Sequence, residues 1–244
     1  MRRVVGRLVD ALFERLADRI ARKSLSQYYF RDMHPATLLQ REAQAEAADY
    51  VKQKMPDALY FMEREPLLRH AVDRATIPGL FLEFGVFSGK SIWVIAQRTS
   101  RLVHGFDSFE GLPEDWAGNK DPKGQYSTGG RLPKVPPNVR LHRGWFSDTL
   151  PGFLQEHAED VSFMHVDCDL YSSARDVLAA TAGRLREGTV IVLDDYFNFP
   201  GWRNHEFKAL QELVARTGME YEYIGYARHQ VALVVKRAPS RPGP

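Results

Sequence analysis

Four aspartates stand at the ends of two apolar segments: Asp167 and Asp169 follow VSFMHV, and Asp194 and Asp195 follow TVIVL. If both segments are neighbouring parallel strands, about 4.8 Å apart, their carboxylates meet in one cluster. Four like charges repel, so either some carboxyl groups are protonated or a cation neutralises them. Oxygen ligands without nearby Cys or His ligand spacing select a hard divalent ion, Mg²⁺ first and Mn²⁺ or Ca²⁺ as alternatives. Taken singly, each aspartate could instead cap a helix.

A glycine turn follows an earlier apolar segment, in EFGVFSGKS. It is not a phosphate-binding loop, because Phe84 stands where the first glycine of that motif belongs, and it is not a dinucleotide fingerprint, because Phe87 stands where the second glycine belongs. What remains is E-x-G-x-x-x-G, formed by Glu83, Gly85 and Gly89. This form is typical of S-adenosylmethionine binding in class I methyltransferases.

Asp107 ends the next apolar segment, 24 residues after Glu83. An acid at that place can hold ribose hydroxyls by charge-assisted hydrogen bonds, although an aspartate at a strand end can also cap the following turn. Further along, Trp145 and Phe146 follow VRLHRG, and they fit either the wall of an adenine site or the core.

Four other residues near these motifs give weaker indications of a functional role. His165 precedes Asp167 by two positions, and we expect a buried structural histidine there. Cys168 should point to the opposite face and lie in the core. Arg203 and His205, in FNFPGWRNHEF, could bind an acceptor or lie on the solvated surface.

Composition indicates an ordinary soluble globular protein of 244 residues, with 44% apolar and 26% charged residues. The net charge is +2, and residues 1–24 hold seven Arg or Lys against three acids, so the rest of the chain is slightly acidic. It therefore has no excess of basic residues that would indicate nucleic-acid binding. One cysteine excludes an internal disulfide and agrees with a cytoplasmic location. We find no transmembrane segment and no secretion signal in the sequence.

From residue 76 to 237, short β-rich segments alternate with helical lengths, which predicts an α/β domain with a Rossmann-like, doubly wound, mostly parallel sheet. The last two segments, YEYIGYA and QVALVVK, are too close for a crossover and should form an antiparallel hairpin. Residues 238–244 should form a disordered tail. The stretch 117–131 is a long polar loop, either a substrate lid or an idle flexible insertion.

Residues 1–75 should form an N-terminal helical extension or cap. Apolar residues recur there at helical spacing and give the first helix one apolar and one basic face: Val5, Leu8, Val9, Leu12, Phe13, Leu16 and Ile20. Such a face needs a partner, either its own domain or a second copy in a homo-oligomer. Docking on a membrane surface is the alternative.

Residues from about 80 to 236 resemble the macrocin O-methyltransferase family. The resemblance is carried by FLEFGVFSGKS, FDSFEGLP, DTLP, VDCDLYSSARDVL and LDDYFNFPGWR, in that order. It implies a seven-stranded Rossmann-like sheet and use of S-adenosylmethionine. The family's usual D-T-D-W-Y is here D-C-D-L-Y, from Asp167 to Tyr171, and the first 75 or so residues match poorly.

Carried over by position, the resemblance implies that Asp167, Asp194 and Asp195 are magnesium ligands and that Asp169 is a candidate general base. Together with the glycine turn and the aromatic pair, it gives the expected cofactor-binding residues, which are Glu83, Gly85, Ser88, Gly89, Asp107, Ser108, Trp145 and Asp167.

The function predicted from these residues is a Mg²⁺-assisted O-methyltransferase that acts on a hydroxyl of a small molecule, favouring a sugar or glycosylated natural product. A cation chelated by vicinal oxygens would favour a diol-like acceptor. Two alternatives remain. One is a catalytically silent S-adenosylmethionine-binding or scaffold protein that docks through its basic N-terminal helix, and the other is a nicotinamide oxidoreductase, which Phe87 disfavours.

Overall fold

The computed structural model describes the backbone of residues 2–240 and the side chains of residues 12–26 and 33–240. The chain divides into two compact units, Met1–Glu42 and Ala43–Pro244. The second unit begins well before residue 76, the boundary expected from the sequence. The reason is packing, since Ala43, Ala47 and Met55 are buried in its core.

The N-terminal unit consists of α1 (Arg2–Met33) and the start of α2 (Pro35–Lys54). Pro35 begins α2, where its missing N–H costs nothing. The apolar residues Leu12, Phe13, Leu16 and Ile20 of α1 are exposed. Val5, Leu8 and Val9, predicted for the same face, lie outside the described side chains, and a partner for this face stays a prediction. Within residues 2–240, no helix has the length and apolar character needed to cross a membrane.

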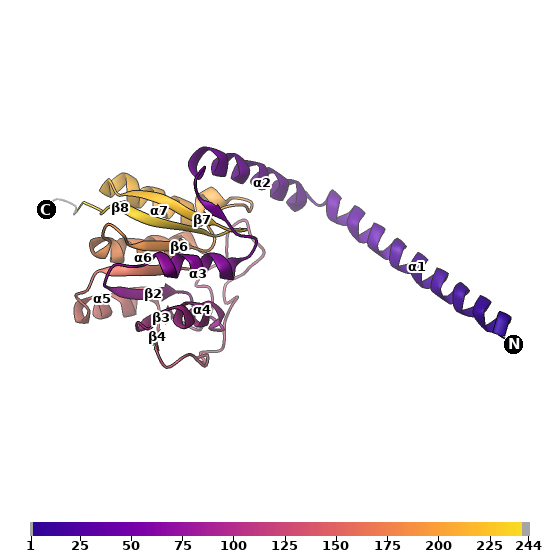
Figure 1. The fold of residues 1–244 in the computed structure, drawn as a ribbon, viewed down its shortest axis with the longest axis horizontal. Coiled ribbons are helices and arrows are strands. Elements are labelled where there is room, and N and C mark those ends of the chain that lie inside the picture. The colour runs from indigo at the N-terminus through magenta and orange to yellow at the C-terminus, as the bar shows by residue number, and fades with distance from the viewer. Residues whose placement is uncertain (1, 241–244) are drawn as a thin grey trace. The chain divides into compact units, whose positions relative to one another are not determined.

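The larger unit is built on an eight-stranded sheet (Figure 1), with strand order β1-β7-β8-β6-β5-β2-β3-β4. The strands are β1 (Leu59–Tyr60), β2 (Leu80–Phe84), β3 (Val103–Asp107), β4 (Val139–Arg143), β5 (Val161–Val166), β6 (Val190–Leu193), β7 (Glu220–Tyr226) and β8 (Val231–Arg237). All neighbours are parallel except β8, which is antiparallel to β6 and β7. The predicted α/β class and antiparallel hairpin are confirmed. The sequence did not predict β1, which pairs in parallel with the end of β7.

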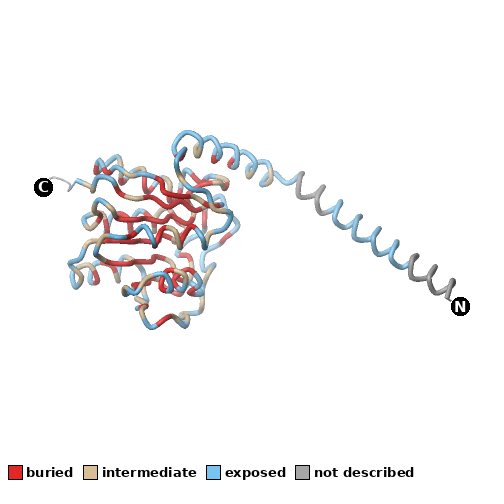
Figure 2. The backbone as a smooth tube through the Cα atoms, in the orientation of Figure 1, coloured by how far each residue is buried: buried red, intermediate tan, exposed pale blue. Residues whose placement is uncertain are grey.

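Helices cover both faces of the sheet. One face packs against α5 (Phe146–Glu156), α6 (Tyr171–Thr181) and α7 (Glu206–Thr217), and the other against α3 (Arg64–Arg74) and α4 (Lys90–Arg98). Successive side chains of β2 therefore point to opposite faces of the sheet. Leu82 and Phe84 lie in the core with α5, α6 and α7, and Phe81 lies in the core with α3 and α4. Two short 3-10 turns, Ala182–Arg184 and Trp202–Asn204, precede β6 and α7. Burial concentrates along the strands (Figure 2).

The long connection between β3 and β4 is ordered and bonded to itself. Leu112 N–H donates to Gln125 O at 2.9 Å, and Trp116 N–H donates to Asp121 O at 3.0 Å. Gly111 has φ +85° and packs so closely on Gly124 that a Cβ would lie 2.5 Å from its carbonyl oxygen. Only glycine fits this turn. The segment therefore has a defined conformation that its own backbone hydrogen bonds hold.

The C-terminal segment is held at its described end. Ser240 N–H donates to Thr217 O at 2.9 Å, which attaches residues 238–240 to the end of α7. The predicted disorder therefore does not extend to Ser240, and residues 241–244 lie outside the described part of the chain.

Candidate active site

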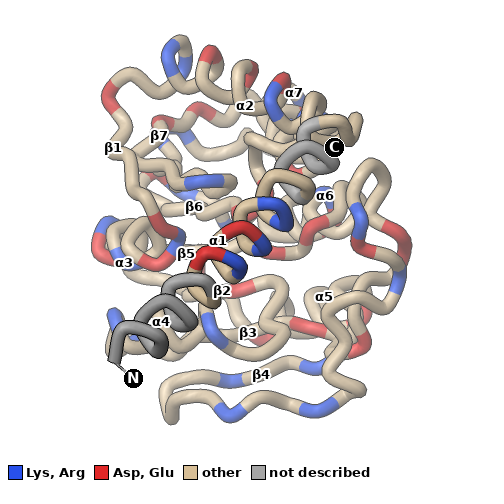
Figure 3. The backbone as a smooth tube through the Cα atoms, turned by 90° about the vertical axis from the view of Figure 1, so that its right-hand side faces the viewer, with Lys and Arg blue, Asp and Glu red and all other residues tan. Residues whose placement is uncertain are grey.

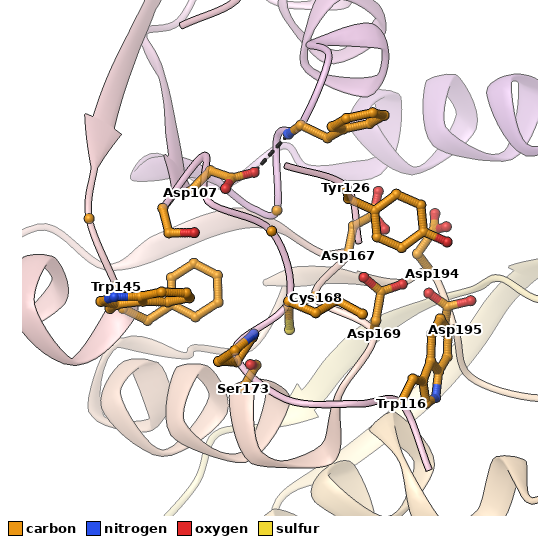
Figure 4. A pocket seen from close by; sticks show the side chains of 18 of the residues that line it. Asp107, Trp116, Tyr126, Trp145, Asp167, Cys168, Asp169, Ser173, Asp194 and Asp195 are labelled. Carbon is orange, nitrogen blue, oxygen red and sulfur yellow. Dashed lines mark hydrogen bonds between the residues drawn. The ribbon is translucent and has the colours of Figure 1, made fainter. Parts of the chain in front are cut away.

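A cavity of about 280 Å³ opens where the carboxyl ends of β2, β3, β5 and β6 meet. Ligands of open α/β sheets bind at this edge. Of the predicted site residues, it is lined by Gly85, Asp107, Ser108, Trp145, Asp167, Asp169, Asp194 and Asp195. Figure 4 shows two groups of side chains on opposite sides of the cavity. Asp107 and Trp145 lie on one side, and the other side holds Asp167, Asp169, Asp194 and Asp195.

Gly85 fixes the turn after β2. Its φ is +93°, and a Cβ built on it would lie 1.7 Å from the carbonyl oxygen of Asp167. The two strand ends can approach only because this residue has no side chain. Gly89, with φ +83°, stands before α4, and Ser88 is exposed in the same turn. Neither of these two lines the cavity.

The carboxylate of Asp107 holds this turn from the neighbouring strand. Its Oδ2 accepts the N–H groups of Val86 at 2.8 Å and Phe87 at 2.7 Å, and its Oδ1 accepts the N–H of Phe109 at 2.6 Å. Three backbone donors on one carboxylate are charge-assisted hydrogen bonds of the stronger kind. Asp107 therefore shapes the cavity as well as facing it.

Beyond Asp107, Ser108 and two aromatic residues form the opposite wall. Ser108 is buried, and its Oγ accepts the N–H of Glu110 at 3.1 Å. Trp145 and Phe146 both line the cavity. Phe146 also packs edge-on against Phe84, with ring centroids 5.8 Å apart, so it serves the core and the wall together.

Asp194 and Asp195 have different surroundings, because successive residues after β6 point to opposite sides of the sheet. Asp194 is turned toward α3. Its Oδ1 accepts from His165 Nε2 at 3.2 Å and from Arg64 Nε at 3.0 Å, and its Oδ2 accepts from Gln230 Nε2 at 3.3 Å. Burial would raise the pKa of Asp194, but the hydrogen bond from His165 and the charge of Arg64 lower it. Asp194 is therefore a partnered carboxylate.

His165 is fully buried, as expected, but it links two acids. Its Nδ1 lies 2.9 Å from Glu83 Oε1, and its Nε2 lies 3.2 Å from Asp194 Oδ1. Burial alone lowers the pKa of His165, yet its bonds to Asp194 and Glu83 raise it to about 10. Glu83 is buried beneath the turn and does not line the cavity. Glu83 is therefore connected to the cavity by way of His165, which contacts Asp194.

Asp167, Asp169 and Asp195 form the accessible carboxylate cluster, in which one oxygen from each lies within 4.8 Å of the others. Asp169 has φ +61°, which turns it toward Asp195. Burial and like charge raise the pKa of all three residues, that of Asp167 to about 6. Three clustered carboxylates, of which only Asp167 has a countercharge among the described residues (Arg64), fit a hard divalent cation.

The implied magnesium ligands Asp167, Asp194 and Asp195 do not form one such cluster among the described residues. Asp167 belongs to two groups, one with Asp169 and Asp195 and one with His165 and Asp194. Asp194 and Asp195 fall into different groups because successive side chains after β6 point in different directions.

Two residues that sequence reasoning missed support the cluster from outside. Glu206, at the start of α7, is buried, and its Oε2 accepts the N–H of Asp195 at 2.9 Å. Burial and the charge of Asp195 raise the pKa of Glu206 well above its usual range. Arg64, at the start of α3, contacts both Asp167 and Asp194. Glu206 stands in FNFPGWRNHEF, whereas no motif marks Arg64.

The segment between β3 and β4 supplies aromatic side chains over the cluster. Trp116 and Tyr126 line the cavity beside the carboxylates (Figure 4). Trp116 packs edge-on against His205, and Tyr126 packs edge-on against Phe87. The sequence left residues 117–131 open between a substrate lid and an idle flexible insertion, and it did not single out these two rings.

Of the remaining sequence candidates, Arg203 and His205 do not line the cavity, whereas Cys168 does. His205 is buried beneath Trp116, and burial lowers its pKa. Arg203 lies over the ring of Trp202, 4.1 Å from its centroid, and pairs with Glu46 at 3.3 Å. Cys168 is buried in the core cluster, as expected, although it also borders the cavity.

Sequence comparison places the chain among methyltransferases. Residues 21–219 match the profile of a family described as macrocin O-methyltransferase. A curated relative from Streptomyces olivaceus, 8-demethyl-8-(2,3-dimethoxy-alpha-L-rhamnosyl)-tetracenomycin-C 4'-O-methyltransferase, is 32% identical over 143 residues. That match covers 49% of this chain and 54% of the relative, so it spans about half of that protein.

Structural comparison gives the same fold. The O-methyltransferase NovP superposes with a TM-score of 0.57 at 23% identity, covering 71% of this chain and 80% of NovP. The calicheamicin methyltransferase CalS11 superposes with a TM-score of 0.58 at 20% identity, covering 82% and 93%. The Rossmann-like sheet is therefore shared with both structures.

Proposed function

Because the chain belongs to the macrocin O-methyltransferase family, we propose that it transfers the methyl group of S-adenosylmethionine to a hydroxyl group of a small molecule. The observation that carries the proposal is the single cavity that joins the Gly85 turn and Asp107 to the carboxylates of Asp167, Asp169 and Asp195. One side of this cavity suits the methyl donor, and the other suits an acceptor oxygen.

The donor side is formed by the glycine turn, Asp107 and Trp145. With Gly85 lacking a side chain, the cavity can extend along the ends of β2 and β5. Asp107 faces the cavity with acceptor oxygens suited to ribose hydroxyls, and its hydrogen bonds to the turn keep it in place. Trp145 offers a flat wall for an adenine ring.

The acceptor side is formed by the accessible carboxylates, Trp116 and Tyr126. Asp167 and Asp195 would hold Mg²⁺ or another divalent cation, which lowers the pKa of a hydroxyl bound to it, and Asp169 lies beside them. Cation chelation by two adjacent oxygens favours a diol-like acceptor. The rings of Trp116 and Tyr126 offer apolar surface to the rest of such a molecule.

In the proposed reaction, an acceptor oxygen forms a bond to the methyl carbon while the carbon–sulfur bond breaks, and S-adenosylhomocysteine leaves. The cavity walls must aim the oxygen at the methyl group at about 3 Å, which is the main contribution of positioning. Asp169 takes the hydroxyl proton. Its carboxylate lies beside Asp167 and Asp195 in the cavity lining, where it would be next to a hydroxyl held by the cation.

We propose a sugar, or a glycosylated natural product, as the acceptor. The support is the relative from Streptomyces olivaceus, whose name describes methylation of a rhamnosyl group at its 4' oxygen. A sugar carries adjacent hydroxyls for the carboxylate side and apolar C–H faces for the aromatic side of the cavity.

The test is production of S-adenosylhomocysteine from S-adenosylmethionine with a panel of acceptors. The panel should contain nucleotide-linked 6-deoxysugars, rhamnosylated aromatic glycosides and catechols. Each acceptor is assayed with Mg²⁺, after chelation of divalent ions, and with the Asp195→Asn variant. A matched control is Asp73→Asn, at an exposed ion pair with Arg98 outside the cavity.

Product formation with a glycosylated acceptor, lost on chelation, is the expected outcome. Full activity after complete chelation would remove the cation from the proposal but leave methyl transfer intact. Binding of S-adenosylmethionine by calorimetry, with no product from any acceptor, would favour a catalytically silent binding protein.

A further inference from the structure

A second cavity, of about 330 Å³, lies between α2, α7 and β7. Its lining includes Tyr50 from α2, Gln211 from α7, and Tyr221 and Tyr223 from β7, and Asp57 joins it from the turn before β1. All of its lining residues belong to the unit Ala43–Pro244. The two cavities have different lining residues, so the second one lies outside the proposed active site.

Four tyrosine hydroxyl groups meet beside this cavity. Tyr223 Oη lies 2.8 Å from Tyr50 Oη and 3.2 Å from Tyr221 Oη, and it also contacts Tyr196 Oη. The hydroxyl oxygens of Tyr50 and Tyr196 are 3.3 Å apart. Burial raises the pKa of Tyr50, Tyr196 and Tyr223, so these hydroxyls keep their protons at neutral pH. The cluster is therefore a network of neutral hydrogen-bonding groups.

The hydroxyl protons of this network are used within it. Each contact between two hydroxyl groups needs one proton, and the four tyrosines make four such contacts with four protons. All four contacts are satisfied only if Tyr221 donates to Tyr223 while the other three hydroxyls donate to one another in a cycle. Gln211 Nε2 adds two donors, to Tyr221 at 3.1 Å and to Tyr196 at 3.5 Å. The network then has no hydroxyl proton to offer a ligand.

Acceptor positions remain on two of the four oxygens. A hydroxyl oxygen can accept two hydrogen bonds. Tyr223 accepts from Tyr221 and from one member of the cycle, and it is filled. Tyr196 is also filled, by Gln211 and one member of the cycle. Tyr50 and Tyr221 each accept one bond within the network, and both line the cavity. A ligand that binds there must therefore donate.

The groups on the lining are suited to an ammonium ion. A primary ammonium group carries three N–H donors and no acceptor, which matches oxygens that have no proton to give. Asp57 supplies a carboxylate as countercharge, and the faces of tyrosine rings attract cations. Lys54 also lines the cavity and repels a cation. Removing its charge should therefore strengthen the binding of a cation and weaken that of an anion.

We propose that this cavity is a second binding site, for a small molecule whose primary ammonium group donates to Tyr50 Oη and Tyr221 Oη. The site is connected to the active site through the chain, because Tyr196 of the network directly follows Asp195. The inference goes beyond the proposed methyl transfer and does not depend on it.

The experiment is a calorimetric titration of the full chain with propylammonium, in the absence of methyl donor, acceptor and divalent ions. Tetramethylammonium is the matched probe, because it has the same charge but no N–H donor, and acetate is the anionic probe. The variants are Tyr221→Phe and Lys54→Met. Tyr60→Phe, at an exposed tyrosine outside the cavity, is the control. Asp195→Asn reports binding in the active-site cavity instead. Thermal unfolding of each variant checks the fold.

We expect propylammonium to bind at least about tenfold more tightly than tetramethylammonium, and Tyr221→Phe to lose at least about tenfold in propylammonium affinity, because an acceptor for a charged donor is removed. Tyr60→Phe and Asp195→Asn should match the wild type. Equal binding of the two cations, no binding of propylammonium, or tighter binding of acetate would overturn the proposal. So would unchanged binding by Tyr221→Phe with a loss in Asp195→Asn, which would place the amine among the active-site carboxylates.

A second variant decides the outcome even if Tyr221→Phe does not fold. Lys54 is exposed, so its replacement by methionine leaves the core intact. Lys54→Met should bind propylammonium at least about twofold more tightly than the wild type, because a like charge on the lining is removed. Unchanged or weaker binding by Lys54→Met would show that the cation lies elsewhere and overturn the proposal.

Discussion

Asp107 Oδ2 accepts the backbone N–H of Phe87 at 2.7 Å, across two neighbouring strand ends. Phe87 has φ +47°, a conformation that a bulky side chain rarely adopts. The aspartate therefore stabilises a turn that the local sequence does not favour. The residue expected to bind the cofactor also builds the site.

Replacing Asp107 by alanine should weaken both the fold and donor binding. The N–H groups of Val86, Phe87 and Phe109 lose their acceptor, so we expect a loss of about 1–3 kcal/mol in the free energy of unfolding. S-adenosylmethionine affinity should fall at least about tenfold, since a charge-assisted ribose contact is lost too. Urea unfolding and calorimetry measure the two effects. Unchanged affinity would show that Asp107 only supports the turn.

Replacing Gly85 by alanine should be severely destabilising. The new Cβ would overlap the carbonyl oxygen of Asp167, and the φ of +93° suits only glycine. We expect a loss of about 3 kcal/mol or more in the free energy of unfolding. Gly152→Ala is the matched control, because Gly152 lies in α5 with open space around it, and should stabilise by up to about 1 kcal/mol. Equal effects of the two changes on thermal unfolding would contradict this account.

Replacing Asp169 by asparagine should remove proton acceptance and leave donor binding intact. We expect kcat to fall by about 10² to 10⁴, the range for loss of a general base. S-adenosylmethionine affinity should change little, because Asp169 lies on the acceptor side of the cavity. Steady-state kinetics and calorimetry provide the two readouts, and Asp176→Asn, at an exposed position on α6, provides the control. A kcat within about threefold of the wild type would exclude Asp169 as the base.

Glu206 should be replaceable by glutamine but not by alanine. Burial favours the neutral carboxylic acid, and glutamine keeps an oxygen that accepts the N–H of Asp195. Glu206→Gln should therefore unfold within about 1 kcal/mol of the wild type, and Glu206→Ala should lose about 1–3 kcal/mol because a buried donor is left unpaired. Chemical unfolding of both variants is the measurement. A large loss in Glu206→Gln would show that the ionised form is needed.

His104 should make stability depend on pH in the acidic range. Burial, together with the neighbouring His142, whose Nε2 lies 3.0 Å from His104 Nδ1, lowers the pKa of His104 to about 4. The unfolded chain takes up this proton near pH 6.5, so the contribution is fully present above pH 6.5 and is lost as pH falls toward 4. The melting temperature should fall less steeply over this range in His104→Asn. Equal slopes in the two proteins would contradict the assignment.

Those parts of the fold that depend on apolar periodicity could be predicted from the sequence. The segments ending in Asp107, Asp167 and Asp194 are buried strands, and parallel pairing brings their ends together. The two-residue strand β1 could not be predicted, because two residues carry no alternation and their pairing depends on the end of β7.

The site could be predicted where chemically reactive residue types stand at the ends of predicted strands, as the four aspartates do. Arg64 could not be found, because it lies in a helix with no motif and reaches the site only through tertiary packing. The division between Asp194 and Asp195 was implicit in strand alternation, but only the structure shows which neighbours each one meets.

The two outermost strands of the sheet differ in how they discourage a second chain from adding to it. At one margin, β1 contributes only Leu59 and Tyr60, and the part of β7 that extends beyond it carries the exposed Glu220 and Glu222, whose charges discourage strand addition. At the other, β4 carries Arg140 and Arg143, both exposed, and Figure 3 shows basic residues along it. Neither margin offers the long, flat, uncharged edge on which aggregates grow. Both edges of the sheet therefore disfavour the addition of strands from another chain.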